Sequence, residues 1–315
     1  MKIAVIGTGL VGSAWAIVFA RAGWSVSLFD NVPGAADRSV ALIAERLDDL
    51  EHNGLIDESA TILARIGKAS SLAEAVAGAA YVQESVFETV MAKRAIFSAL
   101  DAVVGPDTII GSSSSGIPAS AYTDHVACQG RCLVAHPANP PYLIPVVELV
   151  PAPWTSRETM ARVRALMTAV GQEPIELTRE IQGFVMNRLQ GALLTEAWQL
   201  VADGIASVAD IDRTISAGLG LRWSFMGPFE TIDLNAPGGV ADYAKRFGPL
   251  YKDIHASRRE VRDWDDALIA EVERQRRAML SQETLPKRSA WRDHRLMNLA
   301  KHKRAMSDQD RLKGS

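Results

Sequence analysis

Cysteine is scarce in this sequence. Cys128 and Cys132 are the two cysteines among 315 residues, and so small a number excludes a disulfide-stapled scaffold. A lone C-x3-C pair also supplies too few ligands for a zinc site, so we predict that the protein holds no metal. Cysteine usage of this kind is typical of the reducing cytoplasm, where we expect the protein to reside.

Long apolar runs and a strong net charge are missing as well. No window approaches the roughly 18 uninterrupted apolar residues of a membrane-spanning helix. Glycines interrupt the apolar start, MKIAVIGTGLVGSAWAIVFA, at turn spacing, which is not typical of a secretory signal. The 34 Lys and Arg are outnumbered by 37 Asp and Glu and are spread along the chain, so we expect neither a nucleic acid nor a membrane as a partner. A length of 315 residues predicts about two domains.

The sequence does have a glycine-rich turn between two apolar elements. Residues 3–7, IAVIG, have the composition of a strand buried on both faces, and the later SAWAIVFARAG has helical spacing. Between them lies Gly7-Thr8-Gly9-Leu10-Val11-Gly12, and a second strand, SVSLFD, ends at Asp30. Strand, glycine turn, helix, strand and acid in this order predict a dinucleotide-binding unit.

Each position in this unit has a physical task. Gly7 permits the tight turn, Gly9 lets the backbone approach a pyrophosphate, and Gly12 lets helix and strand pack closely. The helix N-terminus offers free N–H groups to the phosphates. Asp30 is expected to accept hydrogen bonds from the adenosine ribose and to repel a 2′-phosphate, and the next three residues, NVP, contain no arginine. We therefore predict NAD rather than NADP as the cofactor.

The rest of the first half alternates helix and strand. A charged segment over about residues 34–66 predicts an inserted pair of helices, which either forms a solvated layer over the sheet edge or a lid near the substrate. After it, LAEAVAGA and VMAKRAIFSALDAVV have the pattern of helices, and AYVQESV, TIIGSSSS and CLVAHP that of strands. This alternation predicts a parallel, doubly wound sheet. Ligands of such sheets lie outside the carboxyl ends of the strands, where we find Glu88, Lys93, the serine run 112–115 and His136.

The segment VAHPANPPYLIPVVELV, residues 134–150, places an imidazole and a carboxylate in mostly apolar surroundings. A lone His136 is by default a packed residue, but buried carboxylates are rare without a partner. Four prolines between His136 and Glu148 let the chain fold back so that the two side chains meet. A carboxylate on one ring nitrogen fixes the tautomer and leaves the other nitrogen facing the substrate. This arrangement suits the general base of an alcohol oxidation.

The serine run admits two interpretations. Its hydroxyls either cap the following helix or place a hydroxyl where the nicotinamide end of the cofactor lies. For the second interpretation the candidates are Ser115 and its neighbour Ser114.

Together, the glycine turn, the serine run, the H-x-x-N-P sequence that starts at His136 and the glutamate twelve residues on resemble the 3-hydroxyacyl-CoA dehydrogenase family, and within it the L-gulonate 3-dehydrogenase branch. The similarity runs over nearly the full length. It implies an α/β fold: a Rossmann-type, doubly wound parallel sheet that binds NAD over residues 1–182, followed by an all-α domain over residues 183–315.

The resemblance also implies roles for individual residues. The catalytic residues that it implies are Ser115, His136, Glu148 and Asn187, the last in the segment GFVMNRLQGALLTEAWQLVADGIAS. The implied NAD contacts are Gly7, Gly9, Leu10, Val11, Gly12, Asp30, Glu88 and Lys93. The candidate substrate contacts are Ser114, Asn139 and Arg222.

One departure from the acyl-CoA branch concerns the substrate. This chain inserts LRWSF before M-G-P-F-E and so places Arg222 next to the predicted cleft. An arginine fork binds a free carboxylate well and serves no obvious purpose for a thioester. We predict that Arg222 anchors the carboxylate of a small 3-hydroxy acid. The alternative is a surface arginine that pairs with a nearby acid.

Long helices replace the alternation after about residue 183. Apolar residues recur at three- and four-residue spacing from Val185 to Leu200, with Asn187 off that stripe. Such a face packs either against a twin or into the core of its own domain. We expect a homodimer formed through the C-terminal domain.

These expectations describe an NAD-dependent dehydrogenase that oxidises the 3-hydroxyl of a small 3-hydroxy acid to the 3-keto acid. L-gulonate is the favoured substrate, and L-carnitine and 3-hydroxybutyrate are alternatives. A dehydrogenase of 3-hydroxyacyl-CoA, such as 3-hydroxybutyryl-CoA, stays open and needs a basic surface near the inserted helices for the CoA phosphates. A non-catalytic, NAD-binding structural protein of the crystallin kind also stays open, although it has no need of the complete Ser, His, Glu and Asn set.

Overall fold

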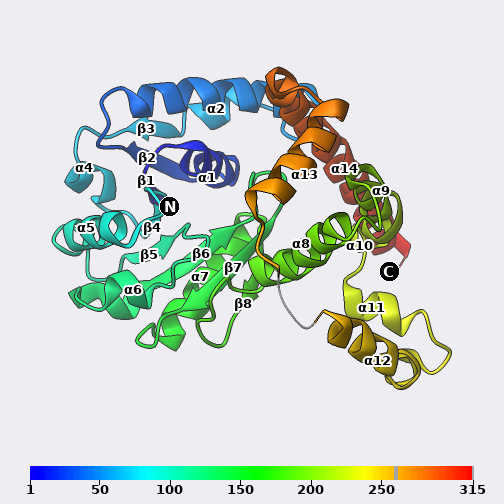
Figure 1. The fold of residues 1–315 in the computed structure, drawn as a ribbon. Helices are drawn as coiled ribbons and strands as arrows, with labels where there is room; N and C mark the ends of the chain where they lie inside the picture. Colours follow the sequence, from blue (N-terminus) through cyan, green and yellow to red (C-terminus); the bar gives the residue numbers. More distant parts are fainter. Residues whose placement is uncertain (259–261, 314–315) are drawn as a thin grey trace. The chain divides into compact units, whose positions relative to one another are not determined.

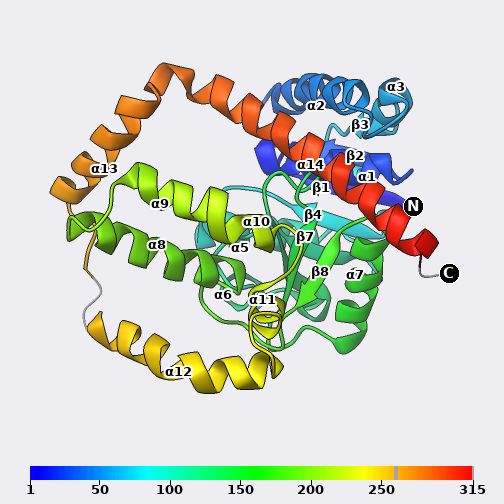
Figure 2. The ribbon, with the colours of Figure 1, turned by 90° about the vertical axis from the view of Figure 1, so that its right-hand side faces the viewer.

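The computed structural model describes residues 1–258 and 262–313. The chain divides into two compact units, the first comprising Met1–Arg188 with Ala290–Ser315 and the second Leu189–Ser289. The sequence-based division at residue 182 places the C-terminal residues in the second domain. In the structure they join the first unit, because Met297 of the last helix, α14 (Leu285–Lys313), is buried in that unit's core. Figure 2 shows this part of α14, in red, beside α1 and α2.

The first unit is built on one eight-stranded sheet with the strand order β3-β2-β1-β4-β5-β6-β7-β8. Every neighbouring pair is parallel except β6 and β7, which are antiparallel. The predicted doubly wound α/β fold is confirmed, with one antiparallel pair added toward the edge. The strands are β1 (Lys2–Ile6), β2 (Ser25–Phe29), β3 (Ile66–Lys68), β4 (Tyr81–Glu84), β5 (Ile109–Ser112), β6 (Cys132–Pro137), β7 (Val146–Pro151) and β8 (Glu173–Glu176).

Helices cover both faces of this sheet (Figure 1). Side chains alternate between the faces of a strand, so Ile3 and Val5 of β1 join one apolar cluster while Ala4 and Ile6 join the other. The first cluster is completed by α1 (Leu10–Arg21), α2 (Ala35–His52), α3 (Ser59–Leu63) and α7 (Arg157–Ala169), and the second by α4 (Leu72–Val76), α5 (Val90–Asp101), α6 (Ser120–Thr123) and the 3₁₀ turn η1 (Ala127–Arg131). This double cover explains why β1 is apolar and buried on both faces from Ile3 to Ile6.

The second unit is helical over its described residues, as predicted for the C-terminal domain. Side chains that are buried in it are few, namely those of Val208, Thr231, Ala236 and Leu268 among the residues described. Its helices are α8 (Met186–Ala202, from Leu189 on), α9 (Val208–Thr214), η2 (Ile215–Leu219), α10 (Gly220–Trp223), α11 (Pro228–Asp233), α12 (Gly239–Ser257), α13 (Asp266–Met279), η3 (Gln282–Thr284) and the start of α14. Among all the described residues, no helix has the length and apolar character that crossing a membrane requires.

Candidate active site

The carboxyl ends of the central strands form one continuous edge of the sheet. Hydrogen bonds between neighbouring chains continue beyond the strands, because Ser85 N–H donates to Ile6 O at 2.7 Å and Ser113 N–H donates to Glu84 O at 2.8 Å. The glycine turn after β1, the segment after β4 and the serine run after β5 therefore lie side by side, as expected for the ligand-binding edge of a doubly wound sheet.

The glycine turn has the geometry that a bound pyrophosphate requires. Gly7 has a φ of +89°, and a Cβ on it would lie 2.5 Å from Ser85 O. A Cβ on Gly12 would lie 1.9 Å from Gly7 O, so no larger residue fits where α1 passes the turn. A Cβ on Gly9 would meet nothing within 4 Å. The backbone at Gly9 thus faces open space, which leaves room for a dinucleotide phosphate.

The start of α1 and the end of β2 complete this cradle. Gly9 is the N-cap of α1 and supplies no side-chain acceptor, so the first N–H groups of the helix are left for an anion. Leu10 at this helix start is 61% exposed. Asp30 accepts hydrogen bonds from Thr8 N–H at 2.7 Å and Val32 N–H at 2.9 Å. The carboxylate at the end of β2 therefore lies against the glycine turn, and the residues present fit NAD.

The serine run separates into three bound hydroxyls and one exposed one. Strand β5 ends at Ser112, earlier than the run TIIGSSSS suggests. The hydroxyls of Ser112, Ser113 and Ser114 contact Glu84, Ser85 and Glu88, respectively. Ser115 is exposed, and its hydroxyl has no hydrogen-bond partner among the described residues, which makes it the serine best placed for a ligand.

Glu88 anchors the loop that carries Ser115. Its Oε1 accepts hydrogen bonds from Ser114 Oγ at 2.7 Å, Ser115 N–H at 2.8 Å and Gly116 N–H at 3.1 Å. Partial burial alone would raise the pKa of Glu88, but these hydrogen bonds and the charge of Lys93 outweigh it and hold the pKa below its usual value. The carboxylate is therefore ionised at neutral pH and keeps the loop in place.

His136 and Glu148 meet through the antiparallel pairing of β6 and β7. The two residues are directly opposite each other in the strand register, so their side chains lie on the same face of the sheet. His136 Nδ1 lies 2.7 Å from Glu148 Oε2, and both side chains are buried. The predicted return of the chain after residue 136 thus brings acid and imidazole into hydrogen-bond contact.

The second oxygen of Glu148 holds the beginning of α8. Oε1 accepts hydrogen bonds from Val185 N–H at 2.8 Å and Met186 N–H at 2.9 Å. The preceding residue, Phe184, has a φ of 51° and is fully buried, with its ring 5.8 Å from that of His136. This left-handed backbone, unusual for a bulky residue, turns the chain so that two N–H groups face the carboxylate. One carboxylate therefore positions both the imidazole and the helix that follows.

Asn187, in the first turn of α8, connects this helix to the serine loop. Its Nδ2 donates to Ser115 O at 2.5 Å. The Ser115–Asn187 and His136–Glu148 pairs are thus linked through residues 185–187 at the start of α8, and together they form one cluster of the first unit.

The protonation of this cluster follows from its partners. Burial alone would raise the pKa of Glu148, but the hydrogen bonds from His136, Met186 N–H and Val185 N–H outweigh it and lower the pKa. An ionised carboxylate only accepts hydrogen bonds, so His136 Nδ1 must carry the proton. The lone pair of the neutral ring is then on Nε2, which can take a proton from an alcohol.

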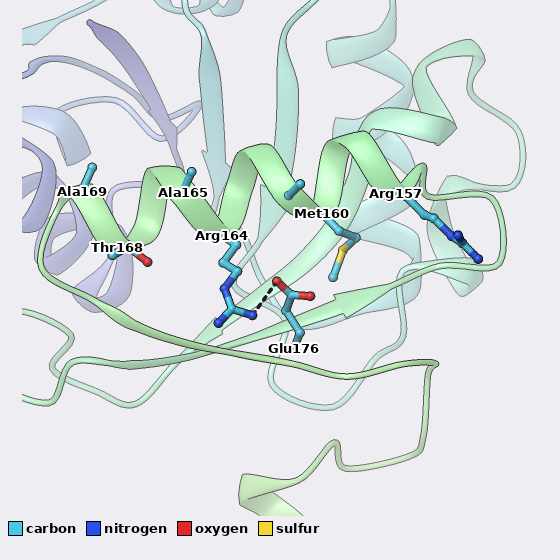
Figure 3. Close-up of a pocket in the computed structure, with 8 residues that line it drawn as sticks. Arg157, Met160, Arg164, Ala165, Thr168, Ala169 and Glu176 are labelled. Carbon is cyan, nitrogen blue, oxygen red and sulfur yellow. Dashed lines mark hydrogen bonds and ion pairs between the residues drawn. The ribbon is translucent and has the colours of Figure 1, made fainter.

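Two further predicted substrate contacts, Asn139 and Arg222, have exposed side chains. Asn139 is exposed in the loop between β6 and β7. Arg222 is exposed on α10 of the second unit, and among the described residues it forms no ion pair. A shallow groove between α7 and β8, crossed by the Arg164–Glu176 ion pair at 3.2 Å, contains none of the predicted site residues (Figure 3).

Two residues of this region escaped the sequence analysis. Glu84 is fully buried at the end of β4. The sequence could have indicated its role, because a carboxylate in an apolar strand needs a partner. No sequence pattern indicates the role of Phe184, because its backbone conformation depends on contacts distant in sequence. Within the part of the chain that the structure describes, no three His, Cys, Asp or Glu side chains are grouped so as to hold a metal ion.

Comparison with known proteins agrees with this geometry. The model of the 3-hydroxyacyl-CoA dehydrogenase NAD-binding domain matches residues 2–181, and that of the C-terminal domain matches residues 183–269. Lambda-crystallin of Oryctolagus cuniculus is 40% identical over 98% of both chains. L-carnitine dehydrogenase of Streptomyces griseus is 41% identical over 79% of this chain and 74% of its own.

A solved structure covers almost the whole chain. It is that of 5-formyl-3-hydroxy-2-methylpyridine 4-carboxylic acid 5-dehydrogenase, described as an NAD+-dependent dismutase, with 28% identity, a TM-score of 0.80 and coverage of 97% of this chain and 98% of that one. The glycine cradle, the histidine–glutamate pair and these full-length similarities agree, and the chain belongs to the 3-hydroxyacyl-CoA dehydrogenase family of NAD-dependent oxidoreductases that act on CH–OH groups.

Proposed function

We propose that this protein oxidises the 3-hydroxyl of a small, free 3-hydroxy acid to the 3-keto acid, with L-gulonate as the favoured substrate. The observation that carries the proposal is the buried contact of 2.7 Å between His136 Nδ1 and Glu148 Oε2, which leaves Nε2 as a proton acceptor. The glycine turn and the start of α1 would hold NAD, which would supply the hydride acceptor for the carbinol carbon.

The residues of the cluster have separate roles in the reaction. His136 Nε2 takes the hydroxyl proton, and Glu148 stabilises the imidazolium that forms. The exposed hydroxyl of Ser115 hydrogen-bonds the reacting oxygen, and Asn187 holds the backbone of Ser115 in place for this contact. A proton acceptor contributes about 10²–10⁴-fold, and positioning of the substrate supplies a large part of the rest.

The charge of the inserted helical segment supports a free acid rather than an acyl-CoA as the substrate. Residues 34–66 carry seven Asp and Glu but three Lys and Arg, and the next basic residue, Lys68, is paired with Asp37. An acidic segment is a poor partner for the phosphates of CoA. L-carnitine is itself a 3-hydroxy acid, and the dehydrogenase of known structure acts on a pyridine carboxylic acid. Both similarities support a substrate with a free carboxylate.

Arg222 is the proposed anchor of that carboxylate. Its guanidinium is free of ion pairs among the described residues, which leaves its fork of donors for a ligand. Replacement of Arg222 by Met should raise KM for the hydroxy acid at least about tenfold, as expected for the loss of a charged hydrogen bond, with little change in kcat. Arg213→Met, which removes the exposed partner of Asp210, is the matched control. An unchanged KM in Arg222→Met would remove Arg222 from the site.

We also propose that the protein is a homodimer through its helical unit. Few side chains of this unit are buried, whereas its helices expose large apolar residues that another copy would cover, including Leu189, Leu193, Phe247, Leu250, Tyr251 and Ile254. Light scattering after size-exclusion chromatography should give twice the chain mass. A mass of one chain at micromolar concentration would contradict this.

A panel of substrates tests the proposed reaction. NADH absorbance is followed with NAD and L-gulonate, L-carnitine, 3-hydroxybutyrate or 3-hydroxybutyryl-CoA. We expect activity with at least one free acid and a much lower kcat/KM for the thioester. The reverse preference would assign the chain to the acyl-CoA substrates, and silence with all four would favour a structural, NAD-binding role.

A further inference from the structure

Two buried serines connect α1 and α2 close to the glycine turn. Ser13 of α1 and Ser39 of α2 are at most 2% exposed, and their Oγ atoms lie 2.8 Å apart. The other buried residues of α2 are apolar, namely Ile43, Leu47 and Leu50, so the helical pattern predicts an apolar residue at position 39 as well. A buried hydroxyl costs free energy unless it is hydrogen-bonded, which indicates that Ser39 is there for its contact with Ser13.

The other hydrogen bonds of Ser13 give this contact a direction. Ser13 Oγ lies 2.8 Å from Gly9 O and 3.1 Å from Thr8 O, and carbonyl oxygens only accept hydrogen bonds. The single hydroxyl hydrogen of Ser13 is therefore donated to the glycine turn, and Ser13 accepts the hydrogen of Ser39. Through Ser13, α2 thus holds two carbonyl groups of the turn.

A carbonyl that is held in place also fixes the N–H group of its own peptide unit. The unit is planar and trans, so the N–H points away from the C=O. The carbonyls of Thr8 and Gly9 share their peptide units with the N–H groups of Gly9 and Leu10, at the start of α1. These are donors that a dinucleotide phosphate needs. The two serines therefore orient these donors from the buried side of the turn.

Thr8 extends the network to the carboxylate at the end of β2. Thr8 is 5% exposed, and its N–H and Oγ1 both donate to Asp30 Oδ2, at 2.7 and 3.1 Å. Val32 N–H donates to Asp30 Oδ1 at 2.9 Å. A carboxylate has about four acceptor sites, two on each oxygen, so Oδ1 retains one. The Thr8 hydroxyl thus orients Asp30 so that a ribose hydroxyl meets one defined oxygen.

We propose that Thr8, Ser13 and Ser39 are positioning residues of the NAD site. The serines orient the backbone donors for the pyrophosphate, and Thr8 orients Asp30 toward the adenosine ribose. The inserted helix α2 then braces the cofactor turn in addition to covering the sheet. This inference concerns cofactor binding and holds whichever hydroxy acid the protein oxidises.

Equilibrium binding of NADH and NADPH separates the two roles. In Ser13→Ala and Ser39→Ala we expect the Kd of both dinucleotides to rise about three- to tenfold, because both contain the pyrophosphate. Thr8→Val keeps the shape of the side chain and the backbone N–H. In this variant the Kd for NADH should rise about tenfold, whereas the Kd for NADPH should not rise, because a 2′-phosphate gains nothing from Asp30. Thr8→Ser restores the hydroxyl and should bind NADH as the wild type does.

Hydrogen exchange of the free protein gives a measurement that needs no ligand. Amides of residues 8–13 should exchange at least about threefold faster in Ser39→Ala than in the wild type. Ser59→Ala is the matched control, because Ser59 belongs to the same inserted segment but its hydroxyl donates to Glu51 at 2.7 Å. This control should equal the wild type in exchange and in both Kd values.

Three results would overturn the proposal. The first is a wild-type Kd for NADH in both Ser13→Ala and Ser39→Ala. The second is an equal rise of the Kd for NADH and NADPH in Thr8→Val, or a Thr8→Ser variant that binds NADH no better than Thr8→Val. The third is unchanged exchange at residues 8–13 in Ser39→Ala. The expected Kd values in a protein that oxidises none of the hydroxy acids would refute the proposed function and leave this inference intact.

Discussion

Replacement of Glu148 by Gln tests the shared carboxylate at the centre of the site. The wild-type side chain accepts hydrogen bonds from His136 Nδ1–H at 2.7 Å and from the N–H groups of Val185 and Met186 at 2.8 and 2.9 Å. Glutamine has the same size but one acceptor oxygen and one NH₂ group. If the NH₂ faces His136, the imidazole proton moves to Nε2 and the base is lost. If the NH₂ faces α8, it meets the N–H donors of Val185 and Met186, and these donors lose their acceptor.

The expected magnitudes follow from these contacts. Loss of the general base lowers kcat by about 10²–10⁴-fold, which corresponds to roughly 2.7–5.4 kcal/mol of transition-state stabilisation. One charge-assisted hydrogen bond, worth about 1.5–3 kcal/mol, is lost, and the remaining ones weaken toward the roughly 0.5–1.5 kcal/mol of neutral bonds. We expect the free energy of unfolding to fall by about 2–4 kcal/mol, since neutralisation also removes the cost of burying a charge.

Steady-state kinetics and urea unfolding of the variant provide the measurement. Glu176→Gln removes a more exposed carboxylate from its pair with Arg164 and should cost less than about 1 kcal/mol with unchanged kcat. A kcat for Glu148→Gln within about threefold of the wild type would refute the assignment of His136 as the base that Glu148 orients.

Two further predictions concern the cofactor cradle and acid stability. Gly12→Ala places a Cβ 1.9 Å from Gly7 O, so the Kd for NADH should rise at least about tenfold. The control Gly67→Ala, which has open space around its Cβ, should leave the Kd for NADH unchanged. A wild-type Kd for NADH in Gly12→Ala would contradict the assignment of the glycine turn as the cofactor site. The lowered pKa of Glu148 means that its stabilisation is present above the unfolded value of about 4.3 and is lost as pH falls through the folded value. The free energy of unfolding, measured by urea denaturation, should therefore fall less steeply with decreasing pH in Glu148→Gln than in the wild type. Identical slopes would show that Glu148 does not contribute to the pH dependence of stability.

The sequence predicted the parts of the site whose geometry is local. The glycine turn lies between a strand and a helix that its own residues specify, and the segment from His136 to Glu148 is short enough for its prolines to indicate a return. The antiparallel direction of β7 was not predicted, because a fold-back can bring the two side chains together without a paired strand. The register that places His136 opposite Glu148 was visible only in the structure.

Residues whose roles depend on distant contacts were less predictable. Glu84 and Lys93 are nine positions apart on a strand and a helix, and their pairing depends on how α5 packs on the sheet. The serine run was one uniform feature in the sequence, yet its first three hydroxyls have different partners and that of Ser115 has none among the described residues, because the loop turns after Ser112. The return of α14 to the first unit through Met297 joins residues too far apart for any local pattern to indicate.

The most direct test of the account compares the wild type with His136→Gln in the oxidation of L-gulonate by NAD. We predict NADH formation by the wild type and a loss of about 10²–10⁴-fold in kcat for the variant, with an unchanged Kd for NADH. Equal rates in the two proteins would contradict a proton-accepting role for His136, and with it the dehydrogenase site described above.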